Sequence, residues 1–175
     1  MKNIRSIFIA LIGFVLIIVP YSCTVSLNGA SIPLNMKTIR VDFFENNAAL
    51  VVNTLSTQFT ETLKARIRNT TRLSIVRSEE ADASLSGAIT DYNISPVSIN
   101  ATANNVAPIA GASQLTITVS VKYVNNINKK DSFQQSFTKS EPFTGDIATH
   151  EQTLITDLNK QITEDIFNKA FASNW

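Results

Sequence analysis

The stretch 114-QLTITVSVKY-123 shows the most regular alternation of apolar and polar residues in the chain. The apolar residues occupy the odd positions and are Leu115, Ile117, Val119, Val121 and Tyr123. Because successive side chains of a strand point to opposite faces of a sheet, this period of two predicts a strand with one face in the core and one polar face. The polar face is expected to meet water while other elements cover the apolar one.

The sequence on both sides of this stretch predicts partner strands. After the polar turn 125–131, Phe133 and Phe137 frame a strand that forms a hairpin with it. A first strand begins near Lys37, and its buried face is predicted to carry Ile39, Val41 and Phe43. Short apolar segments predict further strands at 73–76 and at 83–92, the latter continuing loosely to residue 99. Small residues and Asn dominate 100–113, which we expect to be a mobile loop.

Two segments have the period of an amphipathic helix instead. Residues 53–68 repeat apolar side chains every four positions, at Leu55, Phe59, Leu63 and Ile67. The last element is predicted to start at Thr149, which has the spacing of a capping box with Gln152. Apolar positions then recur at Leu154, Leu158, Ile162, Ile166 and Ala170, followed by Phe171 and Trp175.

The order of these elements predicts an α+β fold with a two-layer sandwich. Two amphipathic helices are expected to pack on one face of a four- to five-stranded sheet, within a single domain over residues 37–175. A chain of this length buries enough surface to fold without disulfides or a structural metal.

The N-terminal segment, residues 1–22, has the layout of a signal peptide. Lys2 and Arg5 precede fourteen uncharged residues, from Ile7 to Pro20, and Ser22 follows. A membrane-spanning helix needs about 20 apolar residues, more than this run supplies. An uncleaved membrane anchor is the alternative interpretation.

Cys23 is the only cysteine of the chain and stands directly after this segment. Its position resembles that of the lipidated cysteine in a bacterial lipobox, although Pro20 and Tyr21 depart from the usual residues and only Ser22 fits. A lone thiol in an exported protein has no internal disulfide partner. Acylation would use it, and more than one acyl chain gives lasting membrane attachment. We expect residues 23–36 to be the lipidated cysteine and a flexible tether, and Thr24, which is not Asp, to favour the outer membrane.

Residues suited to catalysis or metal binding are few. The only histidine, His150, is expected to be exposed at the start of the last helix, and one Cys and one His do not make a zinc site. No Gly-rich phosphate loop and no G-x-S-x-G pattern is present in the sequence. The acidic cluster Glu79, Glu80 and Asp82 is interpreted as a solvated turn. The sequence therefore predicts a protein that is not an enzyme and uses no cofactor or metal.

The charges of the chain are balanced except in one place. Without Lys2 and Arg5, 13 basic residues face 14 acidic ones, which gives no indication of nucleic-acid binding. Five cations without an acid among them lie within fourteen residues: Lys64, Arg66, Arg68, Arg72 and Arg77. Basic side chains at a helix C-terminus also complement the helix dipole. The cluster, with possible help from Lys122, is therefore either a solvated helix end or a site for anionic ligands.

Several stretches together resemble the lipopolysaccharide-assembly lipoprotein family, LptE. They are GASIP (29–33), TIRVDFFENNAALVVNTLSTQFTETLKARI (38–67), TRLSIVRSEEADASLSGAITDYNISPVSI (71–99), LTITVSVKYVN (115–125) and ITEDIFNKAFASNW (162–175). The resemblance implies a lipid-anchored outer-membrane protein, facing the periplasm, that plugs the LptD β-barrel and helps lipopolysaccharide reach the outer leaflet. It also implies contact with the glycolipid through basic surface residues.

A rival interpretation is an outer-membrane lipoprotein that serves another envelope machine, such as a secretin pilot or an activator of a cell-wall synthase. The residues leave this alternative open.

Overall fold

The computed structural model describes residues 32–97 and 112–172. The expected signal peptide, Cys23, and nearly all of the expected loop at 100–113 lie outside these ranges. The alternating stretch 114–123 lies within strand β5, Ala112–Asn125. Residues 112 and 113, expected to belong to the loop, are thus part of the strand.

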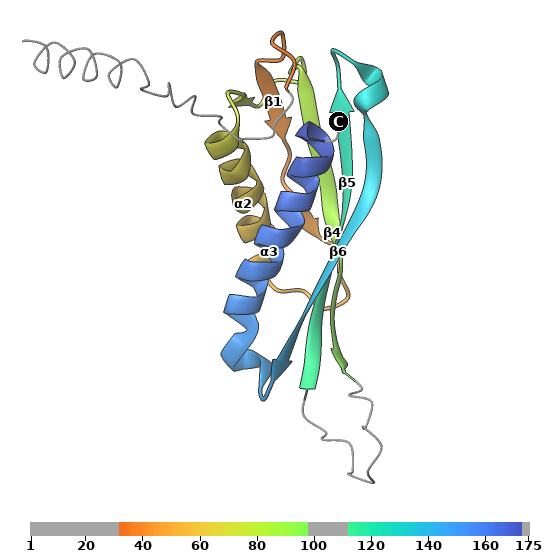
Figure 1. Cartoon of the computed structure of the whole chain (residues 1–175). Coiled ribbons are helices and arrows are strands. Elements are labelled where there is room, and N and C mark those ends of the chain that lie inside the picture. The colour runs from red at the N-terminus through yellow and green to blue at the C-terminus, as the bar shows by residue number, and fades with distance from the viewer. Residues whose placement is uncertain (1–31, 98–111, 173–175) are drawn as a thin grey trace, which may run out of the picture.

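The strands form one mixed sheet (Figure 1). Its order is β3 (Ser74–Val76), β1 (Thr38–Val41), β4 (Ala83–Pro96), β5 and β6 (Phe133–Thr144), and the two-residue β2 (Glu45–Asn46) also pairs with β4. β1 is parallel to both β3 and β4, and β2 is parallel to β4, whereas β4, β5 and β6 run antiparallel. The sheet has six strands because of β2, which is too short to have a sequence pattern.

Two helices cover one face of this sheet, α2 (Leu55–Thr70) and α3 (Ile147–Phe171) (Figure 1). A short 3₁₀ turn, η1 (Lys129–Asp131), lies in the β5–β6 connection. The predicted α+β two-layer sandwich with two helices on one face is confirmed. In the described ranges, neither helix has both the length and the apolar character needed to cross a bilayer.

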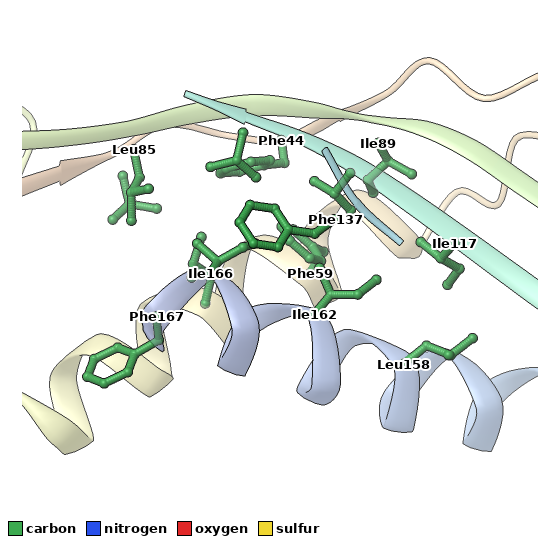
Figure 2. Close-up of a cluster of buried hydrophobic side chains, with 14 of the residues drawn as sticks. Phe44, Phe59, Leu85, Ile89, Ile117, Phe137, Leu158, Ile162, Ile166 and Phe167 are labelled. Carbon is green, nitrogen blue, oxygen red and sulfur yellow. The ribbon is translucent and has the colours of Figure 1, made fainter. Parts of the chain in front are cut away.

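The core lies between the helices and the sheet (Figure 2). Ile117 of β5 and Leu85 of β4 face Ile162 and Ile166 of α3, and all four side chains are fully buried. The five apolar residues at odd positions of β5 are at most 1% exposed, as the alternation predicted. The four apolar residues that define the face of α2 are buried as well. Met36, at the end of the expected tether, is also part of this core.

The prediction that Phe43 lies on the buried face of the first strand is wrong. β1 ends at Val41, Phe43 is 55% exposed, and Phe44 is the buried ring, 5.1 Å from that of Phe59. The chain leaves the β1 register here to bring β2 beside β4, and this shifts the inward-facing position by one residue. Gly87 of β4 leaves room for Phe44, because a Cβ atom at residue 87 would lie 2.7 Å from that ring.

The predicted start of the second helix is also wrong. α3 begins at Ile147, and the Asp146 side chain accepts a hydrogen bond from the Ala148 N–H at 3.1 Å, so Thr149 is not the capping residue. Gly145, with φ at 85°, turns the chain from the end of β6 directly into the helix. Because Gly145 completes the turn, the helix can begin directly after Asp146, whose carboxylate caps its N-terminus.

Candidate functional site

Three of the five residues of the predicted basic cluster form contacts within the domain: Lys64, Arg66 and Arg68. Glu61 forms ion pairs with two of these cations. Its carboxylate lies 2.9 Å from the Lys64 Nζ atom and 4.0 Å from the Arg68 guanidinium. The hydrogen bond from Lys64 lowers the pKa of Glu61. Such exposed pairs contribute little to stability, but they reduce the charge that the helix presents to a ligand.

Arg66 joins the two helices. Its guanidinium lies 3.2 Å from the Glu164 carboxylate of α3 and 5.1 Å from the centre of the Phe167 ring. A cation over an aromatic face is attracted by the negative charge of the ring centre. Arg66 is therefore committed to the α2–α3 interface.

Arg72 and Arg77 are the two cations of the cluster that lie beside β3. Arg72 stands between the end of α2 and the start of β3, and Arg77 directly follows β3. Both side chains are exposed, and neither forms an ion pair with any residue that the structure describes. Together with the half-exposed Arg68, they leave positive charge at the β3 edge of the sheet.

Lys122 does not lie near this cluster. Its neighbours Val121 and Tyr123 point into the core, so the Lys122 side chain points to the opposite, helix-free face of the sheet. α2 covers the other face (Figure 1). The structure thus places Arg72 and Arg77 at the two ends of the edge strand β3 and Arg68 in the last turn of α2, and it separates Lys122 from them.

The remaining candidates have the surroundings that the sequence predicted, with one exception. His150 is exposed, and its ring centre lies 6.3 Å from that of Phe143. Glu79 and Glu80 are exposed, and Glu79 pairs with Arg40 at 3.3 Å. Among residues 32–97 and 112–172, no three His, Cys, Asp or Glu side chains are grouped as metal ligands.

Asp82 is the exception, because it forms structural hydrogen bonds instead of belonging to a solvated turn. Its carboxylate accepts hydrogen bonds from the Lys37 and Thr38 N–H groups at 2.8 and 2.9 Å and from the Thr38 hydroxyl at 2.9 Å. These bonds, the one from the Lys37 backbone foremost, lower the pKa of Asp82. The contact ties the first strand to β4, and no local sequence signal predicts a partner 44 residues away.

The helix-free face of the sheet is unusual in its composition. Across β4, β5 and β6 it carries mainly short hydroxyl side chains: Ser84, Ser86, Thr116, Thr118, Ser120, Ser136, Thr138 and Ser140. Two pairs bond across β5 and β6, Thr116 with Ser140 at 2.7 Å and Thr118 with Thr138 at 3.0 Å. We call these eight residues the hydroxyl face. The sequence showed the alternation in β5 but not that the hydroxyl residues of β6 stand directly beside those of β5.

Comparison with known protein families gives a match that covers most of the chain. The profile of LptE, described as lipopolysaccharide-assembly, matches residues 36–170. The chain belongs to the LptE family. The predicted resemblance is therefore confirmed, and the matched range includes both helices almost completely and every described strand. No curated protein matches the chain.

Solved structures support the fold of this LptE-family chain. A hypothetical protein from Chlamydia trachomatis aligns with a TM-score of 0.53 and 9% identity, over 77% of this chain and 97% of that one. A protein from Xanthomonas campestris aligns with a TM-score of 0.54 and 9% identity, over 79% of this chain and 83% of that one. At such low identity these similarities concern the fold alone.

Proposed function

We propose that this LptE-family chain is a non-enzymatic lipoprotein of the outer membrane that plugs an LptD-type β-barrel. In this role it faces the periplasm and assists the transport of lipopolysaccharide to the outer leaflet. The observation that carries the proposal is the match of residues 36–170 to a lipopolysaccharide-assembly family.

The proposed membrane attachment is through Cys23. It is supported by the sequence pattern: a basic start, a short apolar run and a single thiol at its end. Mass spectrometry of the membrane-extracted protein should find an acylated N-terminal cysteine. An unmodified thiol still preceded by Ser22 would contradict the proposed anchor.

The proposed contact with the glycolipid is through basic residues at the β3 edge. Within the predicted cluster, Arg68, Arg72 and Arg77 are the exposed members, whereas Arg66 is bound to α3 and Lys64 to Glu61. Arginine forms paired hydrogen bonds with phosphate groups, which lipid A carries. The edge beside β3 is therefore the part of the cluster that we assign to lipopolysaccharide.

The partner is tested by affinity purification of the tagged full chain from solubilised outer membranes. The proposal predicts that a large β-barrel of the LptD type is recovered in near-stoichiometric amount. Recovery of a secretin or a cell-wall synthase in its place would favour the rival interpretation and contradict the proposal.

A further inference from the structure

We propose that the hydroxyl face is the surface with which this chain docks against the inner wall of its partner β-barrel. The inference rests on the proposed function and adds to it the side of the domain that meets the wall. Three features of the face support it: its position, its chemistry and its continuity with an open strand edge.

The six members of the hydroxyl face in β5 and β6 lie in the middle of their strands, whereas Ser84 and Ser86 stand near the start of β4. The pairing register aligns the residues of the face in rows across the sheet, so that Ser120 stands beside Ser136 and Thr118 beside Thr138. Both helices lie on the other side of the sheet (Figure 1). The side chains of Ser136, Thr138 and Ser140 are exposed, and no described element covers them.

The chemistry of the face suits a polar, neutral partner surface. Its eight residues carry no charge, and the two charged side chains that share rows with them, Asp91 beside Thr118 and Lys122 beside Ser86, have opposite signs. The helical side, by contrast, presents ion pairs such as Lys64–Glu61 and Lys139–Asp165. Burying those charges would be costly, whereas a hydroxyl both donates and accepts hydrogen bonds.

Short side chains also lower the entropic cost of docking. Serine and threonine lose less rotamer freedom on burial than lysine, arginine or glutamate. They also keep the backbone of the sheet close to its surface, which allows another sheet to approach. The inner surface of a transmembrane β-barrel is polar and built of strands, so it matches this face in both respects.

The outer edge of β6 continues the same surface. The Val97 N–H bonds to the Ala112 carbonyl, and the Asn126 N–H bonds to the Asp82 carbonyl, so even-numbered residues of β5 direct their backbone groups to β4. By the alternation of antiparallel ladders, even-numbered residues of β6 direct theirs outward. Ser136, Thr138 and Ser140 therefore offer hydroxyl groups on the face and backbone groups at the edge.

This edge differs from the opposite one. β6 has 12 residues, whereas the edge strand β3 has 3. A long open edge is a site for further hydrogen bonding that proteins usually cover. We infer that the barrel wall covers both the face and this edge.

The test compares two full-length variants with the same added side chain. Thr118→Arg places a long cation in the middle of the hydroxyl face, and Thr156→Arg places it on the exposed side of α3. Each tagged protein is purified from solubilised outer membranes, and the recovered barrel is quantified. We expect Thr118→Arg to recover at least tenfold less barrel than the parent, and Thr156→Arg to recover as much as the parent.

A folding measurement and a crosslinking experiment distinguish a loss of docking from misfolding of the variant. Circular dichroism and the thermal midpoint of each purified variant should match those of the parent. If Thr118→Arg is misfolded, a variant with a photoreactive amino acid at residue 118 is used in its place. This variant should crosslink to the barrel, whereas a variant with the same group at residue 156 should not.

The possible results separate the two proposals. Equal recovery of the barrel by Thr118→Arg and the parent, or a crosslink only from residue 156, would overturn the docking face but leave the proposed function intact. If Thr118→Arg still recovers the barrel but no longer recovers a second copy of this chain that the parent does recover, the face is a dimer interface. That result would also overturn the docking face. Failure of the parent to recover any such barrel would overturn the proposed function, and the docking face with it.

Discussion

Asp82 connects the first strand of the domain to the start of β4 through its carboxylate. Three hydrogen bonds converge on one carboxylate oxygen, and the Thr38 hydroxyl in turn accepts a bond from the Asp82 N–H at 3.0 Å. This closed arrangement fixes the point where the folded domain begins. The sequence suggested only an acidic turn at this position, because the partners of the carboxylate come from another part of the chain.

Replacing this carboxylate should weaken the domain in a pH-dependent way. The pKa of Asp82 is lowered in the folded state, so its contribution to stability is complete above the unfolded-state pKa. It is lost as the pH falls through the lower, folded-state pKa. Asp82→Asn should therefore lower the thermal midpoint at neutral pH, and the difference from the parent should narrow below about pH 4.

The control for this prediction is Asp91→Asn, a change at an exposed carboxylate within β4. It should leave the thermal midpoint within error of the parent at every pH. A difference between parent and Asp82→Asn that stays constant down to pH 2 would show that the charge of Asp82 does not stabilise the fold.

The secondary-structure elements were predicted well wherever their residues repeat with a clear period. β5 and α2 have unbroken apolar spacing, and the structure places those residues in the core. The errors fall where a local pattern competes with a tertiary contact. The chain changes register after β1 to form β2, and Gly145 sets the start of α3, and neither event has a periodic signal.

The two faces of β5 give a direct test of its orientation. Ile117 is fully buried, so Ile117→Asp should place an unpaired charge in the core, at a cost of several kcal/mol, and prevent stable folding. Thr118, one residue on, is only partly buried and lies on the helix-free face, so Thr118→Asp should cost much less, about 1 kcal/mol. Thermal melts of the two variants measure the difference, and equal midpoints would contradict the assignment of the faces.

Gly87 gives a second test, of the packing between β4 and Phe44. A Cβ atom here would lie 2.0 Å from the Ser120 carbonyl oxygen, so the strands or the ring must move. Gly87→Ala should destabilise the domain by about 1–3 kcal/mol, as overpacking does in other cores. Ala88→Ser, on the opposite face, should change the stability by less than about 0.5 kcal/mol. Urea unfolding of both variants checks this, and a neutral Gly87→Ala would show that the contact is not tight.

At the scale of the whole molecule, the domain has two sides with different chemistry. One side carries the helices and their ion pairs, and the other carries the hydroxyl face. The exposed arginines beside β3, which are Arg68, Arg72 and Arg77, form what we call the basic edge. The sequence predicted the basic residues as one cluster, but only the fold shows that Arg66 is used internally and that Lys122 lies on the far side. The rows of the hydroxyl face depend on the register between β5 and β6, which a sequence pattern does not supply.

The basic edge should bind anionic lipid in a salt-dependent way. Reversing Arg68, Arg72 and Arg77 together to Glu should weaken binding of purified lipopolysaccharide at low salt and leave the circular dichroism spectrum unchanged. Salt should reduce the binding of the parent too, since the screening length is about 8 Å at physiological ionic strength. As a control, the exposed residues Lys129, Lys130 and Lys160 receive the same charge change. If both triple variants bind as the parent does, the basic edge is only a solvated helix end.

If this chain takes part in moving lipopolysaccharide to the outer leaflet, depletion of the protein in its own cells should slow that transport. The measurement is the fraction of newly made lipopolysaccharide that becomes accessible at the cell surface. We predict that this fraction falls on depletion and is restored by the parent chain and by Thr156→Arg, but not by Thr118→Arg. An unchanged fraction in depleted cells would contradict the account.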